Sequence, residues 1–421
     1  MEALNGIDPE RIESLAHAYR HSADADPLLL QRAQAAVLRL RGRIPEAAAA
    51  YRTLLAADPD DVRNRLDAGA VQFANRQWAD AAHHFQAAAQ QNGLPENVYA
   101  NIRRFQAALS QQSRWQFALS FSPVYNSNAN NAAPPHCIRG LYCSRSRAIS
   151  AKGLAYAATA EKTTPLYGGH NLLTAVRIGG TSYYADRKSQ YDDAAAEAAL
   201  GWQWQNHVHS ISLTPFYQIR LSGSDNFDNK SERRRRLLPY AEQSAVGVRA
   251  AFGRRLNAKL SLRLGAELAY PRHREAAVAL NQNGRQESVQ AALSYGNGRA
   301  AVSAAYHYSR LQPQHAQRYG RRNHHAYHRH AVHVGASAAW RSWNGRLLLG
   351  YAERRYRGIA PFSEQAQRNR EYSAELTLAH DKLHWRGLMP AVGYQYSRIR
   401  SNQPWAERRH GQWLLTLEKN F

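Results

Sequence analysis

From Trp115 to the end of the chain, apolar and polar residues alternate with a period of two. Leu260, Leu262 and Leu264 lie on one face of such a segment. Ser261 and Arg263 lie on the other. Because successive side chains of a strand point to opposite faces of a sheet, the alternation predicts strands with one apolar and one polar face. This pattern restricts residues 113–421 to a β architecture.

The connections between these alternating rows differ in length in a regular way. Gaps such as 222–240 and 271–286 are long, whereas 205–207 and 253–256 are tight turns. Long loops at one end and short turns at the other are typical of bacterial outer-membrane barrels, and a soluble β-sandwich has no reason to separate them. We therefore predict an antiparallel transmembrane β-barrel of about fourteen strands. The predicted strands lie near 115–122, 149–160, 170–183, 192–204, 208–221, 241–252, 257–270, 287–295, 299–310, 329–340, 345–356, 371–380, 388–399 and 410–421.

Hydropathy and charge agree with this prediction. No run of about 18 apolar residues occurs, which excludes a membrane-spanning helix, whereas barrel strands keep the mean hydropathy low, here −0.62. The net charge of +23 would ordinarily suggest nucleic acid as a binding partner. However, the arginines lie between alternating strands, as in the run 233–236, and form no recognition helix. We expect contacts with outer-membrane lipid, lipopolysaccharide and acidic client chains, and none with nucleic acid.

Residues 1–112 have helical periodicity and contain a 34-residue internal repeat. Its second-helix pattern, Ala-x-x-x-aromatic, resembles a tetratricopeptide repeat (TPR). The packing positions are Ala47 with Ala81, Tyr51 with Phe85 and Ala35 with Gly69, and Pro59 closes the first repeat. We predict two degenerate repeats between a leading helix and a trailing helix over 96–109. The alternative is an unrelated Ala-rich helical bundle. Either way the helices predict an interaction module, because stacked helix pairs leave a concave face for a peptide.

The period changes from helical to two-residue inside the segment 114–131. We therefore place the boundary between a helical domain, 1–112, and a barrel domain, 113–421. Proline and asparagine end strands and form loops, so the first strand is expected to stop before Pro123 and to lead into an Asn-rich loop.

The chain has two cysteines, Cys137 and Cys143, in a loop rich in Pro and Asn. Their spacing suggests a local disulfide and an oxidising compartment. A zinc site is disfavoured, because His136 would supply only a third ligand. The His-rich stretch 321–333 has no nearby acid or cysteine, so we predict no metal ion there.

No spacing of Ser, His and Asp selects a catalytic trio, and no phosphate loop or other cofactor motif occurs. The sequence therefore predicts neither catalytic residues nor a cofactor. The first residues lack the basic start and apolar core of a signal peptide, so we expect an exported chain to have lost it.

The last predicted strand ends in phenylalanine. Trp413, Leu415 and Leu417 are in register with Phe421. This arrangement resembles the C-terminal signal by which the barrel-assembly machinery recognises outer-membrane barrels. An even number of strands also puts both barrel ends on the short-turn side. We therefore expect a periplasmic helical domain and extracellular long loops.

Taken together, the TPR-like helices, the run SFSPVYNSNANN, the cysteine pair and the barrel resemble the surface lipoprotein assembly modulator family, the translocons of type XI secretion. The resemblance implies transport of surface lipoproteins, or of secreted haem- or metal-binding proteins, across the outer membrane. It also implies periplasmic chaperones as partners. The residues it places on the client path are Pro123, Asn126, Ser127, Asn128, Asn130 and Asn131.

Two other functions fit a barrel of this kind. A passive porin or nutrient channel would use the same strands but would not need a peptide-binding helical module. An outer-membrane enzyme would need a catalytic group that no motif supplies. Small-solute conductance would favour the porin, and turnover on lipid or peptide would favour the enzyme.

Overall fold

The computed structural model describes residues 8–138, 142–184, 191–222, 241–318, 321–361, 363–383 and 389–420. The chain forms two compact units. The first contains residues 1–114 together with the short segments 162–172 and 202–210. The second contains the remaining residues of the β region.

The first unit contains six consecutive helices, which confirms the predicted helical region. Asp8 and Asp26 cap the first two by accepting hydrogen bonds from backbone N–H groups of the first turn, and a proline follows each cap. Asp61 caps the fourth helix in the same way. The helices are α1 (Pro9–Arg20), α2 (Pro27–Leu40), α3 (Ile44–Ala57), α4 (Val62–Ala74), α5 (Trp78–Ala89) and α6 (Glu96–Ser113).

The predicted repeat positions form the cores of this unit. Ala47, Tyr51, Ala81 and Phe85 are all at most 1% exposed. The Phe85 ring stacks on Phe105, with 4.5 Å between centroids. At Gly69 an added Cβ would lie 3.1 Å from the Phe85 ring, so only a minimal side chain allows α4 and α5 to approach this closely. Pro59 lies between α3 and α4. The 34-residue repeat in the sequence therefore corresponds to two successive helix pairs, α2–α3 and α4–α5.

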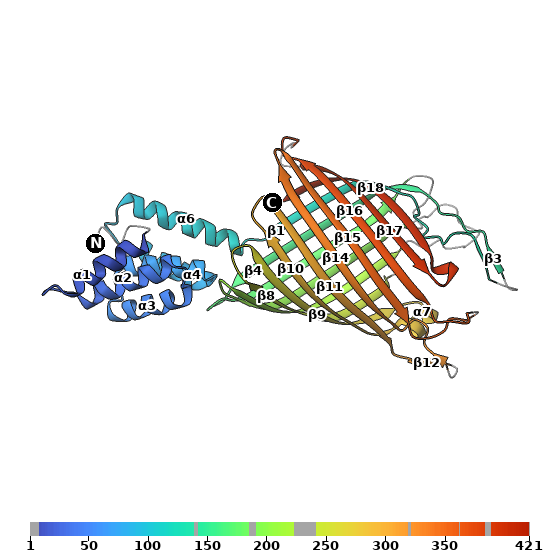
Figure 1. The fold of residues 1–421 in the computed structure, drawn as a ribbon, viewed down its shortest axis with the longest axis horizontal. Helices are drawn as coiled ribbons and strands as arrows, with labels where there is room; N and C mark the ends of the chain where they lie inside the picture. Colours follow the sequence, from blue (N-terminus) through green and yellow to red (C-terminus); the bar gives the residue numbers. More distant parts are fainter. Residues whose placement is uncertain are drawn as a thin grey trace. The chain divides into compact units, whose positions relative to one another are not determined.

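The β region forms a closed antiparallel barrel of fourteen strands, as predicted (Figure 1). Chain neighbours pair with each other around the wall, and β1 pairs with β18 to close it. The strands are β1 (Gln116–Asn126), β4 (Ala151–Pro165), β5 (His170–Tyr183), β6 (Asp193–Gln205), β7 (His209–Ser222), β8 (Ala241–Arg255), β9 (Leu260–His273), β10 (Gly284–Gly296), β11 (Ala300–Pro313), β14 (Tyr327–Trp340), β15 (Trp343–Tyr356), β16 (Arg368–His380), β17 (Met389–Ser401) and β18 (Arg408–Asn420).

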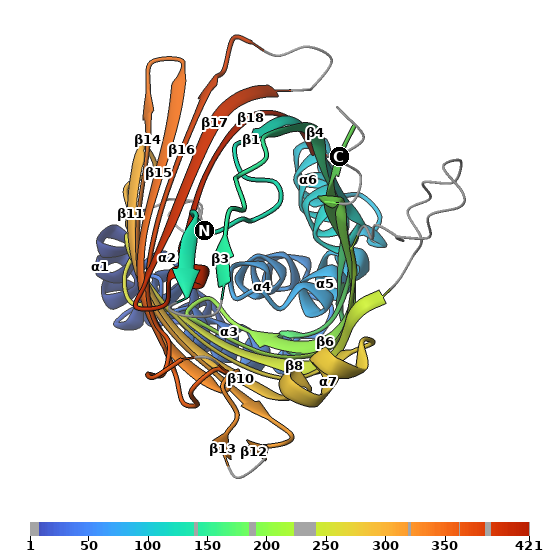
Figure 2. The same ribbon diagram turned by 90° about the vertical axis from the view of Figure 1, so that its right-hand side faces the viewer.

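The connections are separated by length, as the sequence predicts. Tight turns join β6 to β7, β8 to β9 and β14 to β15 at one end. The other end carries the long connections. Among the described residues, four connections at this end contain structure of their own, which the sequence did not predict. These elements are the hairpin β2 (His136–Ile138) with β3 (Tyr142–Ser144), the helix α7 (Ala276–Gln282), the hairpin β12 (Gln317–Arg318) with β13 (Arg321–Arg322) and the 3-10 helix η4 (Pro404–Ala406). Figure 2 views the barrel from this loop end.

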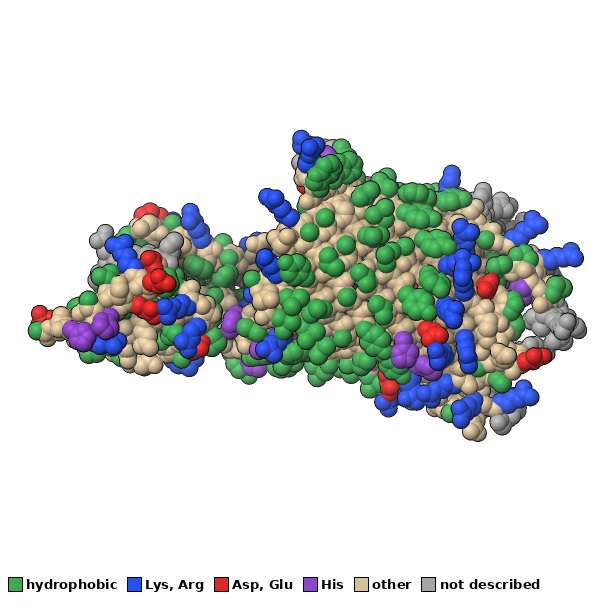
Figure 3. Space-filling model, viewed as in Figure 1, with side chains coloured by type: hydrophobic (Ala, Val, Ile, Leu, Met, Phe, Trp, Pro, Cys, Tyr) green, Lys and Arg blue, Asp and Glu red, His purple; other side chains and the backbone are tan. Residues whose placement is uncertain are grey.

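The outer surface of the barrel is apolar along the middle of the strands. Leu264, Val302 and Leu349 are 39–52% exposed, although each lies within a strand. Figure 3 shows hydrophobic side chains covering the wall, with Lys and Arg gathered toward the loop end. A belt of this kind is what a barrel presents to lipid. Among the described residues, no helix combines the length and apolar character needed to cross a membrane.

The predicted end of the first strand is wrong. β1 continues through Pro123 to Asn126 and pairs with β4 over its whole length. On its other side, the pairing with β18 lapses at Ser122 and Pro123 and resumes at Val124. Proline has no backbone N–H to donate to a neighbouring strand. Pro123 is therefore accommodated within β1 at a position where β18 makes no backbone pairing with it.

Candidate functional site in the barrel lumen

The side chains that face the lumen are identified by the strand alternation. Val176 and Ile178 lie on the outer belt, 41% and 48% exposed, so Arg177 between them points inward. By the same alternation along their strands, Glu197, Arg249 and Glu267 also point inward. The lumen is therefore lined by charged and polar groups.

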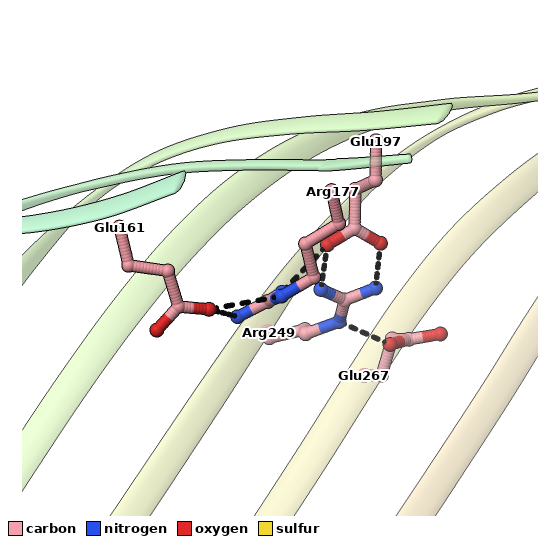
Figure 4. Close-up of polar contacts among 5 residues, drawn as sticks. All are labelled: Glu161, Arg177, Glu197, Arg249 and Glu267. Atoms are coloured by element: carbon pink, nitrogen blue, oxygen red, sulfur yellow. Dashed lines mark hydrogen bonds and ion pairs between the residues drawn. The ribbon is translucent and has the colours of Figure 1, made fainter. Parts of the chain in front are cut away.

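Five of these groups form a ladder of alternating charge, Glu161, Arg177, Glu197, Arg249 and Glu267 (Figure 4). Arg177 donates to Glu161 at 2.6 Å and to Glu197 at 2.9 Å. Arg249 donates two bonds of 2.7 Å to the two oxygens of Glu197, the bidentate geometry that a planar guanidinium favours, and a third of 2.6 Å to Glu267. The ladder crosses the wall from β4 to β9.

One strand inside this span, β7, contributes no charge to the ladder. Its Phe216 is 6% exposed and lies beneath the Arg249 guanidinium, 3.9 Å from the ring centroid. A cation over an aromatic face is attracted by the ring quadrupole. The ring therefore supports Arg249 as it reaches across β7 to Glu197 on β6.

A second charge cluster lies on β14, β15 and β16. Glu371 accepts from Arg329 at 2.8 Å and pairs with the Arg354 Nε at 2.9 Å. All three side chains are at most 29% exposed. Arg354 also lies over the Tyr327 ring, 4.9 Å from its centroid.

A cavity of about 660 Å³ lies between the ladder and this cluster. Arg249, Glu267 and Arg354 border it, together with glutamines from β7, β8 and β10. At the loop end it meets His325, whose pKa burial lowers to about 4, helped by His324 and His273. This histidine is therefore neutral at ordinary pH, whereas Arg249, Arg354 and Glu267 supply charge to the cavity.

The six residues predicted for a client path lie at the end of β1 and at the start of the loop after it. Asn126 and Asn128 are at most 5% exposed. Asn126 donates to the Tyr183 hydroxyl at 2.7 Å, and Asn128 to the carbonyls of Ala132 and Arg409. Asn130 holds the far end of the loop by donating to the Arg147 carbonyl. These amides bind the loop to neighbouring strands.

The other three predicted residues have different environments. Ser127 accepts from the Gly411 N–H at 2.9 Å and so joins the loop to β18. Asn131 has a positive φ of 50°, a conformation that asparagine tolerates better than most residues. Pro123 lies in the wall of the barrel, within β1. The structure thus brings the Asn-rich residues together as a loop anchor beside the lumen.

Cys137 and Cys143 form a disulfide that closes the β2–β3 hairpin. The hairpin extends past the strand ends in Figure 1 and overlies the barrel opening in Figure 2. It therefore lies at the mouth of the lumen.

The remaining candidates lie on the outer wall or beyond the described residues. Trp413 is 57% exposed and packs against Tyr394, and Leu415 follows it on the same face. The Leu417 side chain, Phe421 and the arginines at 233–236 lie outside the described residues. His330 faces outward too, because it has the same strand parity as Val332, which is 48% exposed, and its ring forms a 2.7 Å hydrogen bond with the Tyr306 hydroxyl on that face. No group of metal-ligating residues occurs in the part of the chain that the structure describes.

The ladder is the main feature that sequence reasoning missed. The sequence does contain the information, because every member of the ladder lies at a polar position of the apolar–polar alternation in its strand. These residues are Glu161, Arg177, Glu197, Arg249 and Glu267. The partners are up to 52 residues apart. Only the register in which the strands pair makes these residues neighbours on the inner face of the barrel.

Comparison with known proteins shows to which family the chain belongs. The pattern described as surface lipoprotein assembly modifier matches residues 115–421, and the pattern of that family's N-terminal TPR repeats matches residues 1–85. The chain belongs to the surface lipoprotein assembly modifier family. The family resemblance predicted from the sequence is confirmed.

Individual members of the surface lipoprotein assembly modifier family match over nearly the whole chain. Surface lipoprotein assembly modifier 2 of Neisseria meningitidis is 40% identical, covering 100% of this chain and 85% of that protein. The Pasteurella multocida surface lipoprotein assembly modifier is 26% identical, with 100% and 81% coverage. The hemophilin secretion modulator of Acinetobacter baumannii is 21% identical, with 92% and 77% coverage. These relatives include both domains, so the family likeness extends to the helices and to the barrel.

Proposed function

We propose that this chain is an outer-membrane translocon that moves surface lipoproteins, or secreted haem- or metal-binding proteins, to the cell surface. The observation that carries the proposal is the family match over both domains, joined to a barrel whose lumen is polar and charged. The names of its relatives refer to assembly of surface lipoproteins and to secretion of hemophilin. A polar lumen suits a chain whose backbone groups must be satisfied inside the membrane.

We further propose in which compartment each part of the chain lies. The barrel domain, 113–421, crosses the outer membrane, the helical domain, 1–112, lies in the periplasm, and the long loops are extracellular. Basic side chains gather at the loop end, where lipopolysaccharide would offer anionic groups (Figure 3). We expect the barrel-assembly machinery and periplasmic chaperones as further partners.

The helical domain would receive the client before it enters the barrel. Its two helix pairs, α2–α3 and α4–α5, have the packing of TPR repeats, whose concave faces bind extended peptides. The client would then pass the charge ladder as an incompletely folded chain. Because the chain has no nucleotide-binding motif, folding of the client outside would supply the direction.

We propose no enzymatic role, and neither rival function accounts for both domains. A porin would use the lumen but not the peptide-binding helices. An outer-membrane enzyme would need a nucleophile and base aligned in the lumen, whereas the lumenal charges described above are paired with each other.

The test compares surface labelling of a tagged lipoprotein in cells with and without this chain. Candidates are lipoproteins encoded beside its gene. Each is probed in intact cells with a tag antibody, and total lipoprotein is measured after lysis. We expect surface signal only when the chain is present, at unchanged total amount. Equal labelling without the chain would contradict the translocon, and small-solute conductance of the purified barrel would then favour the porin.

A further inference from the structure

The closing seam of the barrel, where β1 meets β18, differs from the β1–β4 pair beside it. The register runs Ala118 with Asn420 to Phe121 with Leu417, stops, and resumes at Val124 with Leu414. No backbone pairing joins Ser122 and Pro123 to β18, although both pair with β4. Because Pro123 lacks an N–H, the seam has lost part of its hydrogen-bond ladder in the middle of a strand.

On the lumenal side, several of the side chains next to the lapse are small. A cavity of about 690 Å³ is bordered there by Ser120, Ser122, Gly393 and Thr416. The hydroxyl of Ser122 donates to that of Thr416 at 2.9 Å, a neutral contact across the gap. Such a bond contributes roughly 1 kcal/mol net, less than a charge-assisted one. The charge ladder, in contrast, starts on β4 and runs away from the seam.

On the lipid side, a second pocket reaches the same place. It has a volume of about 330 Å³ and is bordered by Pro123, Tyr125, Trp413 and Leu415, with Val392 on β17. Its borders are mainly apolar. Leu414, which pairs with Val124 where the β1–β18 register resumes, borders both this pocket and the lumenal cavity. The lumenal cavity and the lipid-side pocket therefore meet at one residue next to the lapse in pairing.

A lipoprotein poses a physical problem for a closed barrel. Its polypeptide suits a polar lumen, but moving an acyl chain out of an apolar environment costs about 0.8 kcal/mol per CH₂. Both parts remain in a favourable environment only if the polypeptide lies in the lumen while the acyl anchor lies in the membrane. The wall between them must then be open.

We propose that the barrel opens between β1 and β18 at Ser122–Pro123, and that the pocket bordered by Pro123, Trp413 and Leu415 receives the acyl anchor of a lipidated client. The inference rests on the proposed function, because it takes a lipoprotein as the client. At Ser122 and Pro123 the described β1–β18 pairing is interrupted inside the strand, and the lumenal cavity and the apolar pocket share Leu414 beside this interruption.

The test locks the seam with a disulfide. In Ser122→Cys with Thr416→Cys, oxidation joins β1 to β18 across the lapse. The matched control is Ser294→Cys with Ser303→Cys, directly opposed lumen-facing residues of β10 and β11. Both variants keep Cys137 and Cys143. The probe is a tagged lipoprotein whose surface labelling the unaltered chain supports.

We expect the oxidised seam variant to lose surface display of this lipoprotein, down to the level of cells lacking the chain, and to regain it on reduction. The control should display the lipoprotein in both states. Recovery on reduction shows that the seam variant is folded. Full display by the oxidised seam variant, with cross-linking verified by mass spectrometry, would overturn lateral opening while leaving the proposed function intact. If the unaltered chain supports surface display of none of the lipoproteins tested, so that no such probe is found, the proposed function itself is overturned.

The anchor site is tested by a photoreactive phenylalanine analogue at Leu415, with Leu349 on β15 as control. Both side chains face outward and are similarly exposed, 44% and 47%. The lipoprotein carries an alkyne-labelled acyl chain. We expect light to link the labelled lipoprotein to position 415 and not to 349. Adducts with bulk lipid only, or equal adducts at both positions, would overturn the anchor site.

Discussion

At the scale of single residues, the lumen is organised by shared carboxylates. Glu197 binds two guanidiniums while its own side chain is only 10% exposed. Such a group stabilises both neighbours, because each arginine would otherwise face the other's charge. Glu371 has the same place between Arg329 and Arg354. These carboxylates hold neighbouring strands at fixed positions in the wall.

Replacing Glu197 with Gln should therefore destabilise the barrel. The substitution removes the charge that Arg177 and Arg249 share, and breaking a buried pair by removing one partner costs several kcal/mol. Here the arginines are 46% and 33% exposed, so water screens them and we expect about 1–2 kcal/mol. The measurement is the urea midpoint of the purified barrel in detergent.

Glu353→Gln is the control for this substitution. Glu353 pairs with Arg355, which is 52% exposed, so its loss should change stability by less than about 1 kcal/mol. Equal midpoints for the two variants would show that the ladder adds nothing to stability.

At the scale of elements, the loop after β1 owes its shape to its asparagines. Asn126, Asn128 and Asn130 each donate a hydrogen bond from the side-chain amide. Each also accepts one from a backbone N–H group, that of Asn128, Ala132 and Ile149 respectively. Sequence reasoning placed these residues on a client path and gave loop building as their ordinary role. The hydrogen bonds show that ordinary role directly, and the client path stays a prediction.

Replacing Asn126, Asn128 and Asn130 with Ala distinguishes a role in holding the loop from a role on the client path. We expect the triple variant to assemble as a barrel, because the strand ladder does not depend on these amides, but to be cleaved by protease between 127 and 150. Cleavage is followed by mass spectrometry on the purified protein. Lost display with an intact, uncleaved loop would instead assign the asparagines to the client path. Asn257→Ala, in the tight turn after β8, is the control, since that amide accepts from the Lys259 and Leu260 N–H groups.

At the scale of the whole molecule, the barrel closes through its own strands. Every strand from β1 to β18 in the wall has two hydrogen-bonded neighbours, which removes the free edges that make sheets aggregate. The cores of the helical region are formed by residues of α1 to α6. Each fold therefore has its own stabilising contacts.

Residues 113–421 expressed alone should fold into the outer membrane but fail to display a client. Folding is checked by the different gel mobility of heated and unheated barrel, and display by surface labelling. A barrel that displays its client without residues 1–112 would show that the helices are not needed for delivery. Supplying residues 1–112 as a separate chain in the periplasm tests whether delivery requires covalent linkage.

The sequence by itself determined the architecture. The two-residue alternation, the separation of loop lengths and the 34-residue repeat predicted the barrel, its fourteen strands and the repeat positions, because these features depend on local periodicity. Tertiary structure decided what periodicity leaves open. Whether Pro123 ends a strand depends on the neighbour its missing N–H would face, and the ladder depends on the register of strands far apart in the chain. Both are set only when the barrel closes.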